Sequence, residues 1–456
     1  MLEEHRTRDL VVVVPGILGS VLHTPDGRPA WDVSLALGAH LLRNFCEVLD
    51  TLRLPPGLGY GPPPAEFALC PTGLMGGLQV WPGFWKGAGY LALRDALREC
   101  LRDPDQQLMF FPYDWRLSNR YNARLLRDRV EQRLDEWRRG DGGSDAQLQL
   151  ICHSMGGLIG RYFLHVLGGQ EMTRRAYTLG TPYSGSVKAV RVLTGRLLPS
   201  PVSGLGERLR DIATTFPSIA ELLPTYACVT EPGSTAATPL ADHHLPDLDP
   251  QAVEHSTAFH REIHEAEAAS PHDLVHVFAG GWQPTEQAVL IDGPELRFHR
   301  LQRGADFAGD GTVPRFSSVP PHWKDDAHVL LYPAKHVGLP SNKHVLRDLT
   351  RRINTVPLSE ALTPQRRLSL HLPSVALADR AVPLRVRTDS PQLLLDAHVR
   401  TPKGTPTGPP IPLLADGTGT YTADLALPPG TWHIVVTTPR ESPASSVEDL
   451  VVVAQY

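Results

Sequence analysis

The sequence predicts an α/β protein with a mostly parallel central sheet, followed by a smaller all-β region. Short apolar, β-branched segments alternate with amphipathic helical segments over roughly the first 350 residues. After about residue 362 this alternation gives way to short β-rich segments separated by turns. The chain of 456 residues is also too long for one ordinary domain. We therefore expect a large domain over residues 1–360 and a β-sandwich, roughly immunoglobulin-like, over residues 365–456.

The first domain is predicted to alternate strands and helices in a regular order. Leu10–Val14 is a fully apolar, β-branched segment, which is typical of a buried parallel strand. Further strands are expected at Leu108–Phe111, Gln147–Cys152, Ala176–Leu179, Leu274–Phe278 and His328–Tyr332. Helices are expected at Tyr90–Leu101, Asn122–Arg138, Gly156–Val166 and Asn342–Ile353. This order predicts a parallel sheet with helices on both faces.

Two segments of the first domain lack this alternation. About residues 20–85 are irregular and rich in Gly and Pro, and about residues 184–270 hold turn clusters with short amphipathic pieces. We expect both to be insertions that form a cap or lid above the sheet. In the tail, strands are expected at Leu368–Leu372, Pro383–Val386, Leu393–Val399, Tyr421–Leu425, Trp432–Thr437 and Asp449–Val453.

Composition and charge exclude several classes of protein. The hydrophobic content of 41% and the charged content of 20% are those of a soluble globular chain. A net charge of −5 gives no basic face for nucleic acid. No segment is long and apolar enough for a transmembrane helix, and Met1–Arg6 lacks the layout of a secretory signal. We therefore expect a cytoplasmic protein, with peripheral contact to membranes, whose five cysteines are free thiols.

A strand-to-helix turn carries the strongest chemical signal of the sequence. Ile151-Cys152-His153-Ser154-Met155-Gly156-Gly157 follows an expected strand and opens an expected helix. This is the context of a nucleophile elbow, in which a serine on a tight turn exposes its hydroxyl. Gly156 supplies a small residue after the serine, whereas Cys152 stands where glycine is usual. We expect Ser154 to be the nucleophile and His153 to be structural, pointing into the sheet; the alternative is a chance turn with a capping serine.

Such a serine needs a histidine base and an acid that orients the histidine. In this chain order the acid and then the histidine follow the serine, on loops after later strands. Asp310 is the acid candidate, because its flanking glycines allow a tight turn that presents a carboxylate at a strand end. The alternative is a simple Asp-Gly turn. Asp306 and Asp292 are weaker candidates.

The base candidate is His336, which directly follows an expected strand and precedes the closing helix. His344 ranks second because it lies inside that helix. His322 and His328 precede the strand and would lie at its other end. The alternative for His336 is an ordinary histidine of a surface loop.

Two backbone amides are candidates for an oxyanion hole. The N–H of Met155 lies at the N-terminus of the helix that follows the serine. The loop after the first strand, Pro15–Ser20, offers the N–H of Ile17 as the second donor. An ordinary glycine turn is the alternative interpretation of that loop.

Together these motifs resemble the lecithin:cholesterol acyltransferase-like family of α/β-hydrolases, which includes lysosomal phospholipase A2 and phospholipid:diacylglycerol acyltransferases. The resemblance rests on Val14-Pro15-Gly16 with Leu18-Gly19, on Tyr113-Asp114-Trp115-Arg116, on His153–Gly156, on Leu179–Pro182 and on Gly309–Val313. It extends over about residues 10–350 and leaves out the β-rich tail. It implies an α/β-hydrolase fold and transfer of an acyl chain to Ser154, with His336 as base, Asp310 as orienting acid, and Ile17 and Met155 as oxyanion donors.

Of these motifs, Tyr113–Arg116 separates the family most clearly from other lipases, because generic lipases lack it. It follows an expected strand and should therefore lie at the C-terminal edge of the sheet, near the site. We expect Asp114 and Arg116 to pair beside the indole of Trp115 and to brace a loop. Direct contact with substrate is the alternative.

The resemblance also draws attention to the first insertion. Trp81, Phe84 and Trp85 lie where family members touch lipid, so they could face a membrane or line an acyl site; a hydrophobic anchor under the cap is the plainer interpretation. Secreted members carry a disulfide in this region. Cys46 and Cys70 lie in the corresponding segment, and we expect both to be reduced.

The sequence therefore predicts a serine-dependent hydrolase or O-acyltransferase that acts on phospholipid or glyceride acyl chains. No metal or cofactor is required. Two alternatives remain: a carboxylesterase for soluble esters, or a non-catalytic scaffold whose β-sandwich binds a protein partner. A wide apolar pocket beneath residues 184–270 would favour lipid, and a narrow one would favour soluble esters. The tail could bind a partner, a carbohydrate or a membrane, or only support the fold.

Overall fold

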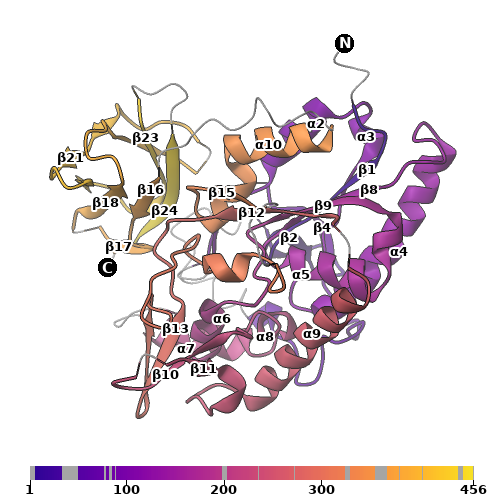
Figure 1. Ribbon diagram of the computed structural model, residues 1–456, viewed down its shortest axis with the longest axis horizontal. Helices are drawn as coiled ribbons and strands as arrows, with labels where there is room; N and C mark the ends of the chain where they lie inside the picture. Colours follow the sequence, from indigo (N-terminus) through magenta and orange to yellow (C-terminus); the bar gives the residue numbers. More distant parts are fainter. Residues whose placement is uncertain are drawn as a thin grey trace.

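The central feature of the computed structural model is a six-stranded parallel sheet in the order β15-β12-β9-β8-β1-β7 (Figure 1). Its strands are β1 (Leu10–Val14), β7 (Leu108–Phe110), β8 (Leu148–His153), β9 (Thr173–Leu179), β12 (Val275–Gly280) and β15 (Val329–Tyr332). The structure describes residues 6–32, 50–76, 79–81, 85–87, 89–197, 203–234, 236–271, 273–323, 329–354, 367–378, 380–402, 404–439 and 445–454. The strand order and the parallel pairing are those of the α/β-hydrolase fold, as predicted from the sequence.

Helices cover both faces of this sheet, and each face has its own apolar core. Helices α2 (Leu91–Cys100) and α10 (Lys343–Ile353) lie on one face, and α4 (Asn119–Arg139) and α5 (Gly156–Arg161) lie on the other. Strand β1 supplies alternate valines to the two cores, which explains why all five of its residues are apolar and buried. Further short helical segments lie at Pro104–Gln107, Tyr162–Val166, Gly169–Met172, Leu240–Asp242, Arg315–Ser318 and His336–Ser341.

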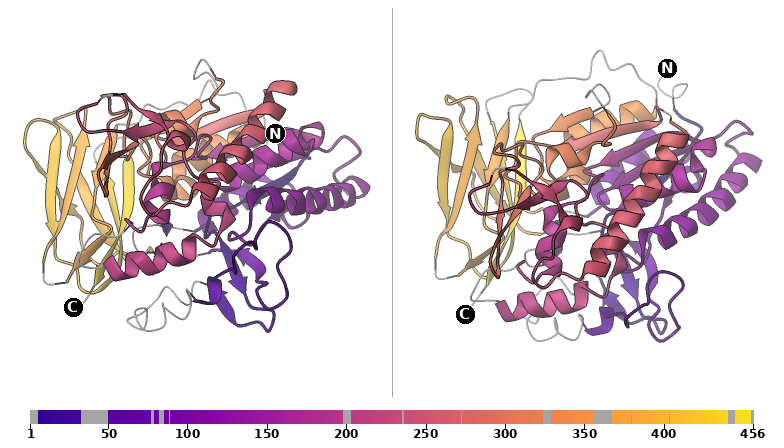
Figure 2. Two further views of the ribbon diagram at one scale, coloured as in Figure 1. Left: turned by 90° about the horizontal axis from the view of Figure 1, so that it is seen from below. Right: turned by 60° about the horizontal axis from the view of Figure 1, so that its bottom comes forward.

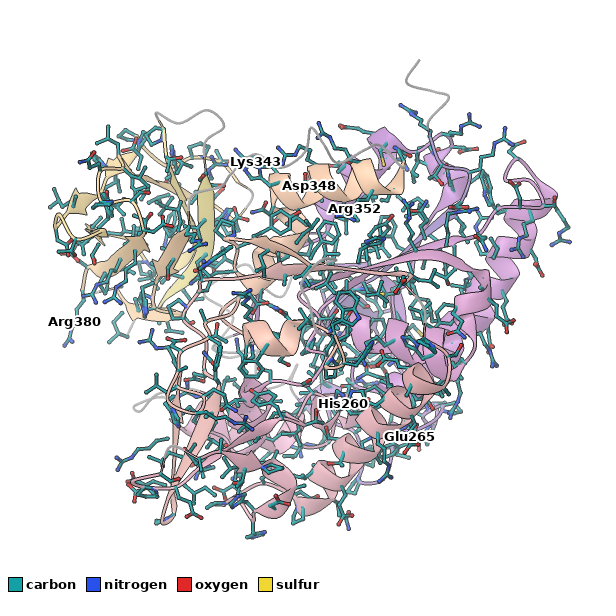
Figure 3. The ribbon with its side chains drawn as sticks, viewed as in Figure 1. His260, Glu265, Lys343, Asp348, Arg352 and Arg380 are labelled. Atoms are coloured by element: carbon teal, nitrogen blue, oxygen red, sulfur yellow. The ribbon has the colours of Figure 1, made fainter. Side chains whose placement is uncertain are left out.

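Helix α10 closes the sheet at the strand that precedes His336. The Tyr332 hydroxyl donates a hydrogen bond of 2.8 Å to Asp348, which lies on the buried side of this helix. Lys343, Asp348 and Arg352 follow one another along the helix (Figure 3). Within the described residues, no helix has the length and the apolar character that a membrane crossing requires.

The first insertion is more regular than expected. Strands β2 (Ser20–His23), β3 (Pro29–Trp31) and β4 (Cys70–Leu74) form a small antiparallel sheet in the order β3-β2-β4. A hairpin of β5 (Gln79–Trp81) and β6 (Trp85–Gly87) follows. Figure 2 shows the three-stranded sheet projecting from the body of the molecule. Its strands have three to five residues, too short for a clear alternation in the sequence.

The cap combines four helices with a second sheet, in the order β11-β10-β13-β14. The helices are α6 (Val187–Leu193), α7 (Ser203–Ala213), α8 (Pro217–Ala220) and α9 (Pro250–Ala269), and the strands are β10 (Ala227–Thr230), β11 (Thr238–Pro239), β13 (Ala288–Asp292) and β14 (Glu295–His299). The cap therefore extends past residue 270, because the β13–β14 hairpin joins β10. Helix α9 is longer than the short pieces expected, and it begins with Asp249 as N-cap and a proline at its first turn.

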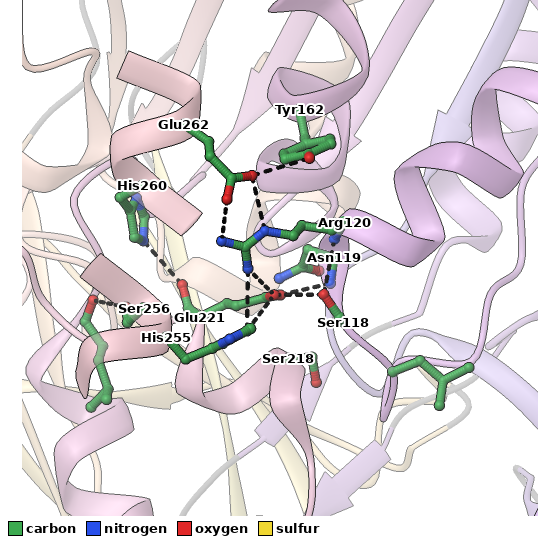
Figure 4. Close-up of polar contacts among 12 residues, drawn as sticks. Ser118, Asn119, Arg120, Tyr162, Ser218, Glu221, His255, Ser256, His260 and Glu262 are labelled. Carbon is green, nitrogen blue, oxygen red and sulfur yellow. Dashed lines mark hydrogen bonds and ion pairs between the residues drawn. The ribbon is translucent and has the colours of Figure 1, made fainter. Parts of the chain in front are cut away.

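A buried glutamate fixes the cap to the core (Figure 4). Glu221 has no exposed surface, and its carboxylate accepts hydrogen bonds from the Ser118 hydroxyl and from the backbone N–H of Asn119, each of 2.6 Å. Arg120 and His255 also contact it, at 3.2 and 2.9 Å. The carboxylate thus satisfies the first turn of α4 while pairing with a cation, which is the condition for burying a charge.

A second buried ion pair joins α9 to the helix behind Ser154. Arg161 contacts both carboxylate oxygens of Glu267 at 2.8 Å and donates to the Tyr183 carbonyl at 3.2 Å. Burial alone would raise the pKa of Glu267, but Arg161 and His165 lower it well below its usual range. The cap is therefore joined to the hydrolase core at two places by charges that are buried and paired.

The C-terminal residues form two sheets around a third apolar core, in the orders β16-β18-β22-β21 and β17-β24-β23-β19-β20. Their strands are β16 (Leu368–His371), β17 (Val375–Leu377), β18 (Val382–Thr388), β19 (Asp396–Arg400), β20 (Ile411–Pro412), β21 (Leu414–Ala415), β22 (Thr420–Leu425), β23 (Gly430–Thr437) and β24 (Ser446–Ala454). This arrangement is a β-sandwich, and each strand expected from the sequence is present in it. It lies beside β15 and the cap hairpin (Figure 1).

Candidate active site

Ser154 lies directly after β8, at the C-terminal edge of the parallel sheet. Its φ is +52°, in the left-handed region that non-glycine residues rarely adopt. Hydrogen bonds of 2.9 Å hold the turn, from the Ser154 N–H to the Leu179 carbonyl and from the Gly157 N–H to the Ser154 carbonyl. A strained serine between a strand and a helix is what the sequence motif predicts for an elbow.

Small residues are required at this turn because strand and helix touch. A Cβ added to Gly156 would lie 2.3 Å from the Pro15 carbonyl oxygen, so no side chain fits. The departure at Cys152 has a local explanation. A Cβ on Gly160, one turn into the helix, would lie 2.6 Å from the Cys152 sulfur. The thiol therefore occupies space that Gly160 leaves open.

Three side chains from distant parts of the chain meet at this edge of the sheet. The Ser154 hydroxyl lies 2.7 Å from His336 Nε2, and His336 Nδ1 lies 2.7 Å from Asp310 Oδ2. Since a carboxylate only accepts, Nδ1 carries the proton and Nε2 is free to accept from the serine. All three residues are buried.

Backbone N–H groups of its own loop hold the Asp310 carboxylate in place. Oδ1 accepts from the backbone N–H groups of Thr312 and Val313 at 2.9 and 2.7 Å, which leaves Oδ2 for His336. The His336 N–H donates to the Asp310 carbonyl at 2.9 Å, so the two loops also pair through their backbones. Gly180, with a φ of +62°, makes room for this pair, because a Cβ there would lie 3.1 Å from His336 Nδ1.

The weaker candidates lie elsewhere. Asp306 is exposed and Asp292 is half-buried, both near the cap hairpin, where Asp292 pairs with Arg297 at 3.2 Å. His344 is buried within α10. His322 is 59% exposed and lies 3.8 Å from Glu267, and His328 falls outside the described residues.

The loop after β1, which carries the predicted oxyanion donor Ile17 and is called the oxyanion loop below, is tightly turned. The Gly19 N–H donates to the Gly16 carbonyl at 3.0 Å, and Leu18 between them has a φ of +61°. Ile17 and Met155 are both buried, and in the described part of the chain neither backbone N–H has an acceptor. Buried amides without a partner are costly and rare in folded proteins, and they are the groups that an oxyanion hole uses.

One feature of the site was missed in the sequence: a hydrogen-bonded link through Tyr90. The Gly16 N–H donates to the Tyr90 hydroxyl at 2.8 Å, and this hydroxyl lies 2.8 Å from His153 Nδ1. His153 Nε2 lies 3.2 Å from the His336 carbonyl. The His153 ring therefore points toward His336, with ring centroids 5.4 Å apart, and not into the sheet as expected.

The protonation of His153 follows from these partners. A carbonyl only accepts, so Nε2 carries the proton and Nδ1 accepts from the tyrosine. Burial, and then the neighbouring His336, lower the pKa of His153 to about 3, which keeps the ring neutral. The link thus joins the oxyanion loop to the histidine loop. Tyr90 begins an expected helix, and nothing in the sequence marked its hydroxyl as a partner of the site.

Asp114 and Arg116 pair as predicted, at 2.7 Å, and both are buried. Arg116 also donates to the carbonyls of Leu52 and Phe67, at 3.2 and 2.9 Å. The pair thus holds the first insertion against the sheet. Trp115 lies between them in sequence and donates to the Ser20 carbonyl at 3.3 Å.

An apolar pocket lies between the oxyanion loop and the cap. It has about 10 Å³ of room, and its walls are Ile17, Leu18, Trp115, Val192, Leu197, Leu209, Ala213, Phe216 and Ile219. A separate crevice of about 190 Å³ reaches Asp310 and His336 from the side of the C-terminal sandwich. The walls of the first pocket are apolar, and its volume is about that of a single water molecule.

Two expectations concern residues that are described only in part. Trp81 and Trp85 lie on the β5–β6 hairpin, and Phe84 falls outside the described residues, so the aromatic cluster stays a prediction. Cys70 is a free, exposed cysteine of β4, and Cys46 falls outside the described residues.

Comparisons with known proteins agree with the resemblance predicted from the motifs. The model of the family described as lecithin:cholesterol acyltransferase matches residues 89–296. This segment includes Ser154, the Tyr113–Arg116 motif and most of the cap. No curated protein matches the sequence significantly.

Solved structures show similarity of fold. A chain of the Tle4–Tli4 complex is 13% identical and has a TM-score of 0.53, over 78% of this chain and all of that one. A lipase of Bacillus licheniformis in propeptide form is 11% identical, with a TM-score of 0.34 over 97% of this chain and 73% of that one. Phospholipase PlaB of Legionella pneumophila is also 11% identical, with a TM-score of 0.28 over 96% and 90%. Of these three structures, the chain of the Tle4–Tli4 complex supports the assigned fold.

Proposed function

We propose that this chain, which matches the lecithin:cholesterol acyltransferase family over residues 89–296, is a serine-dependent enzyme that cleaves or transfers the acyl chains of lipid esters. The observation that carries the proposal is the unbroken arrangement of Ser154, His336 and Asp310, joined by two contacts of 2.7 Å at a strained elbow. Nucleophile, base and orienting acid are the minimum that serine catalysis of acyl transfer requires.

The first half of the reaction acylates the serine. Ser154 Oγ attacks the ester carbonyl carbon while its proton passes to His336 Nε2, and Asp310 stabilises the imidazolium that forms. The oxygen of the tetrahedral intermediate accepts from the N–H groups of Ile17 and Met155, each contributing about 3 kcal/mol to the transition state. The intermediate then collapses, and the alcohol leaves with the proton from Nε2.

The second half returns the serine to its free form. Water, or an acceptor alcohol, gives a proton to His336 Nε2 and attacks the acyl-enzyme carbonyl. Collapse of the second intermediate breaks the bond to Ser154 Oγ, which takes the proton back. Water yields a free fatty acid, and an alcohol yields a new ester, so the acceptor alone decides between hydrolase and transferase.

The substrate is proposed to be a phospholipid or a glyceride. The family match supports an acyl chain as the group that is transferred. The alternative is a carboxylesterase for soluble esters, which a narrow substrate pocket would favour; the space of about 10 Å³ beside Ile17 admits neither substrate. Acyl chain length therefore separates the two candidates. Contact with a lipid surface is part of the first candidate only.

The test compares products and chain length with one set of variants. Purified protein is incubated with phospholipid vesicles, with and without a long-chain alcohol, and the products are identified by mass spectrometry. A series of soluble p-nitrophenyl esters with increasing acyl length is measured in parallel. Ser154→Ala should lose about 10⁴-fold or more in kcat while its circular dichroism stays unchanged. Ser270→Ala, at the exposed end of α9, is the matched control.

Each outcome assigns the activity. Ser154-dependent fatty acid without new ester means a hydrolase, and a new alcohol ester means an acyltransferase. Activity confined to the shortest soluble esters would replace the lipid assignment by the esterase. If the Ser154→Ala variant is as active as the wild type, the proposed mechanism is wrong.

A further inference from the structure

The loop that carries His336 lies against the last strand of the chain. Lys335 Nζ lies 2.5 Å from Asp449 Oδ2 of β24, and the two side chains are 15% and 6% exposed. The neighbouring Glu448 accepts from the Ser341 hydroxyl at 3.1 Å. A short helical segment, His336–Ser341, is therefore held at both ends by consecutive acidic residues of the β-sandwich.

Asp449 occupies a position that a sandwich would ordinarily fill with an apolar residue. Along β24 it lies in the same row as Val447, Val451 and Val453, which face the sandwich core. A carboxylate in such a row costs stability unless it is paired, and the cation that pairs with it comes from the residue next to His336. The strand thus carries a charge whose partner belongs to the hydrolase domain.

The loop that carries Asp310 is held by the same sandwich through Gln283. The Gln283 side chain is fully buried; its amide donates to the Leu368 carbonyl at 2.8 Å and accepts from the Leu370 N–H at 3.0 Å. Its backbone N–H donates to the Gly309 carbonyl at 2.9 Å, and the Gly309 N–H donates back at 3.1 Å. One side chain thus connects β16 to the residue that precedes Asp310.

We propose that the C-terminal β-sandwich is a positioning element of the active site, which holds the loops of His336 and Asp310 at reacting distance through Asp449 and Gln283. The proposal rests on the proposed function, because it assigns the two loops to the triad. It gives the sandwich a role in the chemical step, distinct from binding a partner or supporting the fold. The residues that hold the loops lie outside the segment that matches the family, apart from Gln283.

The charges of Lys335 and Asp449 allow a test by pH profile, which a purely structural role of this pair would leave unchanged. The titratable and charged groups around the His336 loop are Asp310, His153, Lys188, Lys335, His371, Glu448 and Asp449. Paired, Lys335 and Asp449 have no net charge. Removing Asp449 leaves a cation beside His336, which favours the neutral imidazole. Removing Lys335 leaves an anion, which favours the imidazolium.

The experiment measures kcat, KM and the pH profile of the full-length protein on a soluble p-nitrophenyl ester. The variants are Asp449→Asn, Lys335→Met and the pair-preserving Lys335→Arg. Asp424→Asn, an exposed acid on β22 of the other sheet, is the control. Circular dichroism and a thermal scan establish that each variant is folded at the assay temperature.

We expect Asp449→Asn and Lys335→Met to lower kcat about 10- to 100-fold with KM changed by about twofold or less, because a small misplacement of the base affects the chemical step most. Since the base must be neutral to act, the acid limb of kcat/KM should move to lower pH in Asp449→Asn and to higher pH in Lys335→Met. Lys335→Arg and Asp424→Asn should resemble the wild type.

Folded variants with the wild-type kcat and acid limb would overturn the inference, as would an equal loss in Asp424→Asn. If Lys335→Met does not fold because it leaves the buried Asp449 carboxylate without its cation, Asp449→Asn decides alone, since the cation that it leaves is the more exposed partner. The two proposals fail in different ways. If the proposed function is wrong, the activity does not depend on Ser154. If this inference is wrong, the activity depends on Ser154 but does not change when the Lys335–Asp449 pair is altered.

Discussion

The nucleophile elbow and the two loops that face it are built in different ways. The elbow is fixed by steric fit: the strain at Ser154, the close approach of Gly156 to the Pro15 carbonyl and the fit of Cys152 against Gly160 leave no room for added atoms. The loops of Asp310 and His336 depend on long-range contacts, with β16 and β24 more than 50 residues later in the chain.

This difference predicts how each region fails. A turn that is fixed by steric contacts tolerates no added atom. A loop that is fixed by an ion pair and by hydrogen bonds keeps its backbone conformation when one contact is lost, while its side chain shifts by a fraction of an ångström. Stability should therefore suffer most from changes in the elbow, and rate from changes in the loops.

The largest effect on stability is expected for Gly156→Ala. The added Cβ would lie 2.3 Å from the Pro15 carbonyl oxygen, so strand and helix must separate. We expect a loss of at least about 3 kcal/mol in the free energy of unfolding, measured by urea denaturation, together with loss of Ser154-dependent activity. Gly61→Ala, where an added Cβ meets open space, is the control. Equal stability of the two variants would show that the elbow is less constrained than its contacts indicate.

Tyr90→Phe tests the link between the two regions and should have an intermediate effect. Loss of the hydroxyl removes the hydrogen bonds that it makes with the Gly16 N–H and with His153 Nδ1, which should cost about 1–3 kcal/mol of stability. We also expect kcat to fall about tenfold, since the oxyanion loop and the His336 loop are then no longer joined. Tyr60→Phe, on a side chain that is 48% exposed, is the matched control. A wild-type kcat in Tyr90→Phe would mean that each loop is positioned without the link.

The smallest effect concerns the cap, and it depends on pH. Burial, and then Arg161, lower the pKa of His260 to about 3, so the folded protein holds this ring neutral. In the unfolded chain the ring titrates near pH 6.5, so the unfolded state binds a proton that the folded state refuses. This contribution to stability is complete above about pH 6.5 and is lost as the pH falls toward 3.

His260→Gln keeps a donor for the Glu221 carbonyl, which His260 Nε2 contacts at 3.0 Å, but removes the titration. Between about pH 7 and pH 5 the wild type should lose about 2 kcal/mol more stability than the variant. Thermal unfolding at both pH values measures this difference. If cap and core unfold together, as their buried ion pairs indicate, the change appears in the single main transition. A separate transition that alone responds to His260→Gln would contradict this.

The comparison of the two regions also separates what the sequence could predict from what it could not. The elbow motif, the parallel sheet and the positions of Asp310 and His336 each depend on short segments with a known mechanical requirement, and the expected strands are present where the sequence placed them. The β13–β14 hairpin and the small sheet of the first insertion were not predicted, because their strands gain their order from neighbours distant in sequence.

The contacts that hold the site were the least predictable part. Tyr90 and His153 resemble ordinary core residues in the sequence, and their link exists only because α2 lies over the start of β1. Asp449 interrupts a row of valines in the sequence, but the sequence does not show that its partner is Lys335, beside His336. Hydrogen bonds between remote segments leave no pattern in a single sequence.

The fit of Cys152 against Gly160 has a consequence for covalent inhibitors. The sulfur is two residues from the nucleophile, yet it is sealed between strand and helix, and burial raises the pKa of the thiol far above its usual range. It has neither the thiolate nor the access that alkylation requires. Maleimides and similar electrophiles will therefore label the exposed Cys70 and spare the elbow. Compounds that inactivate the protein must be chosen for their reaction with an activated serine.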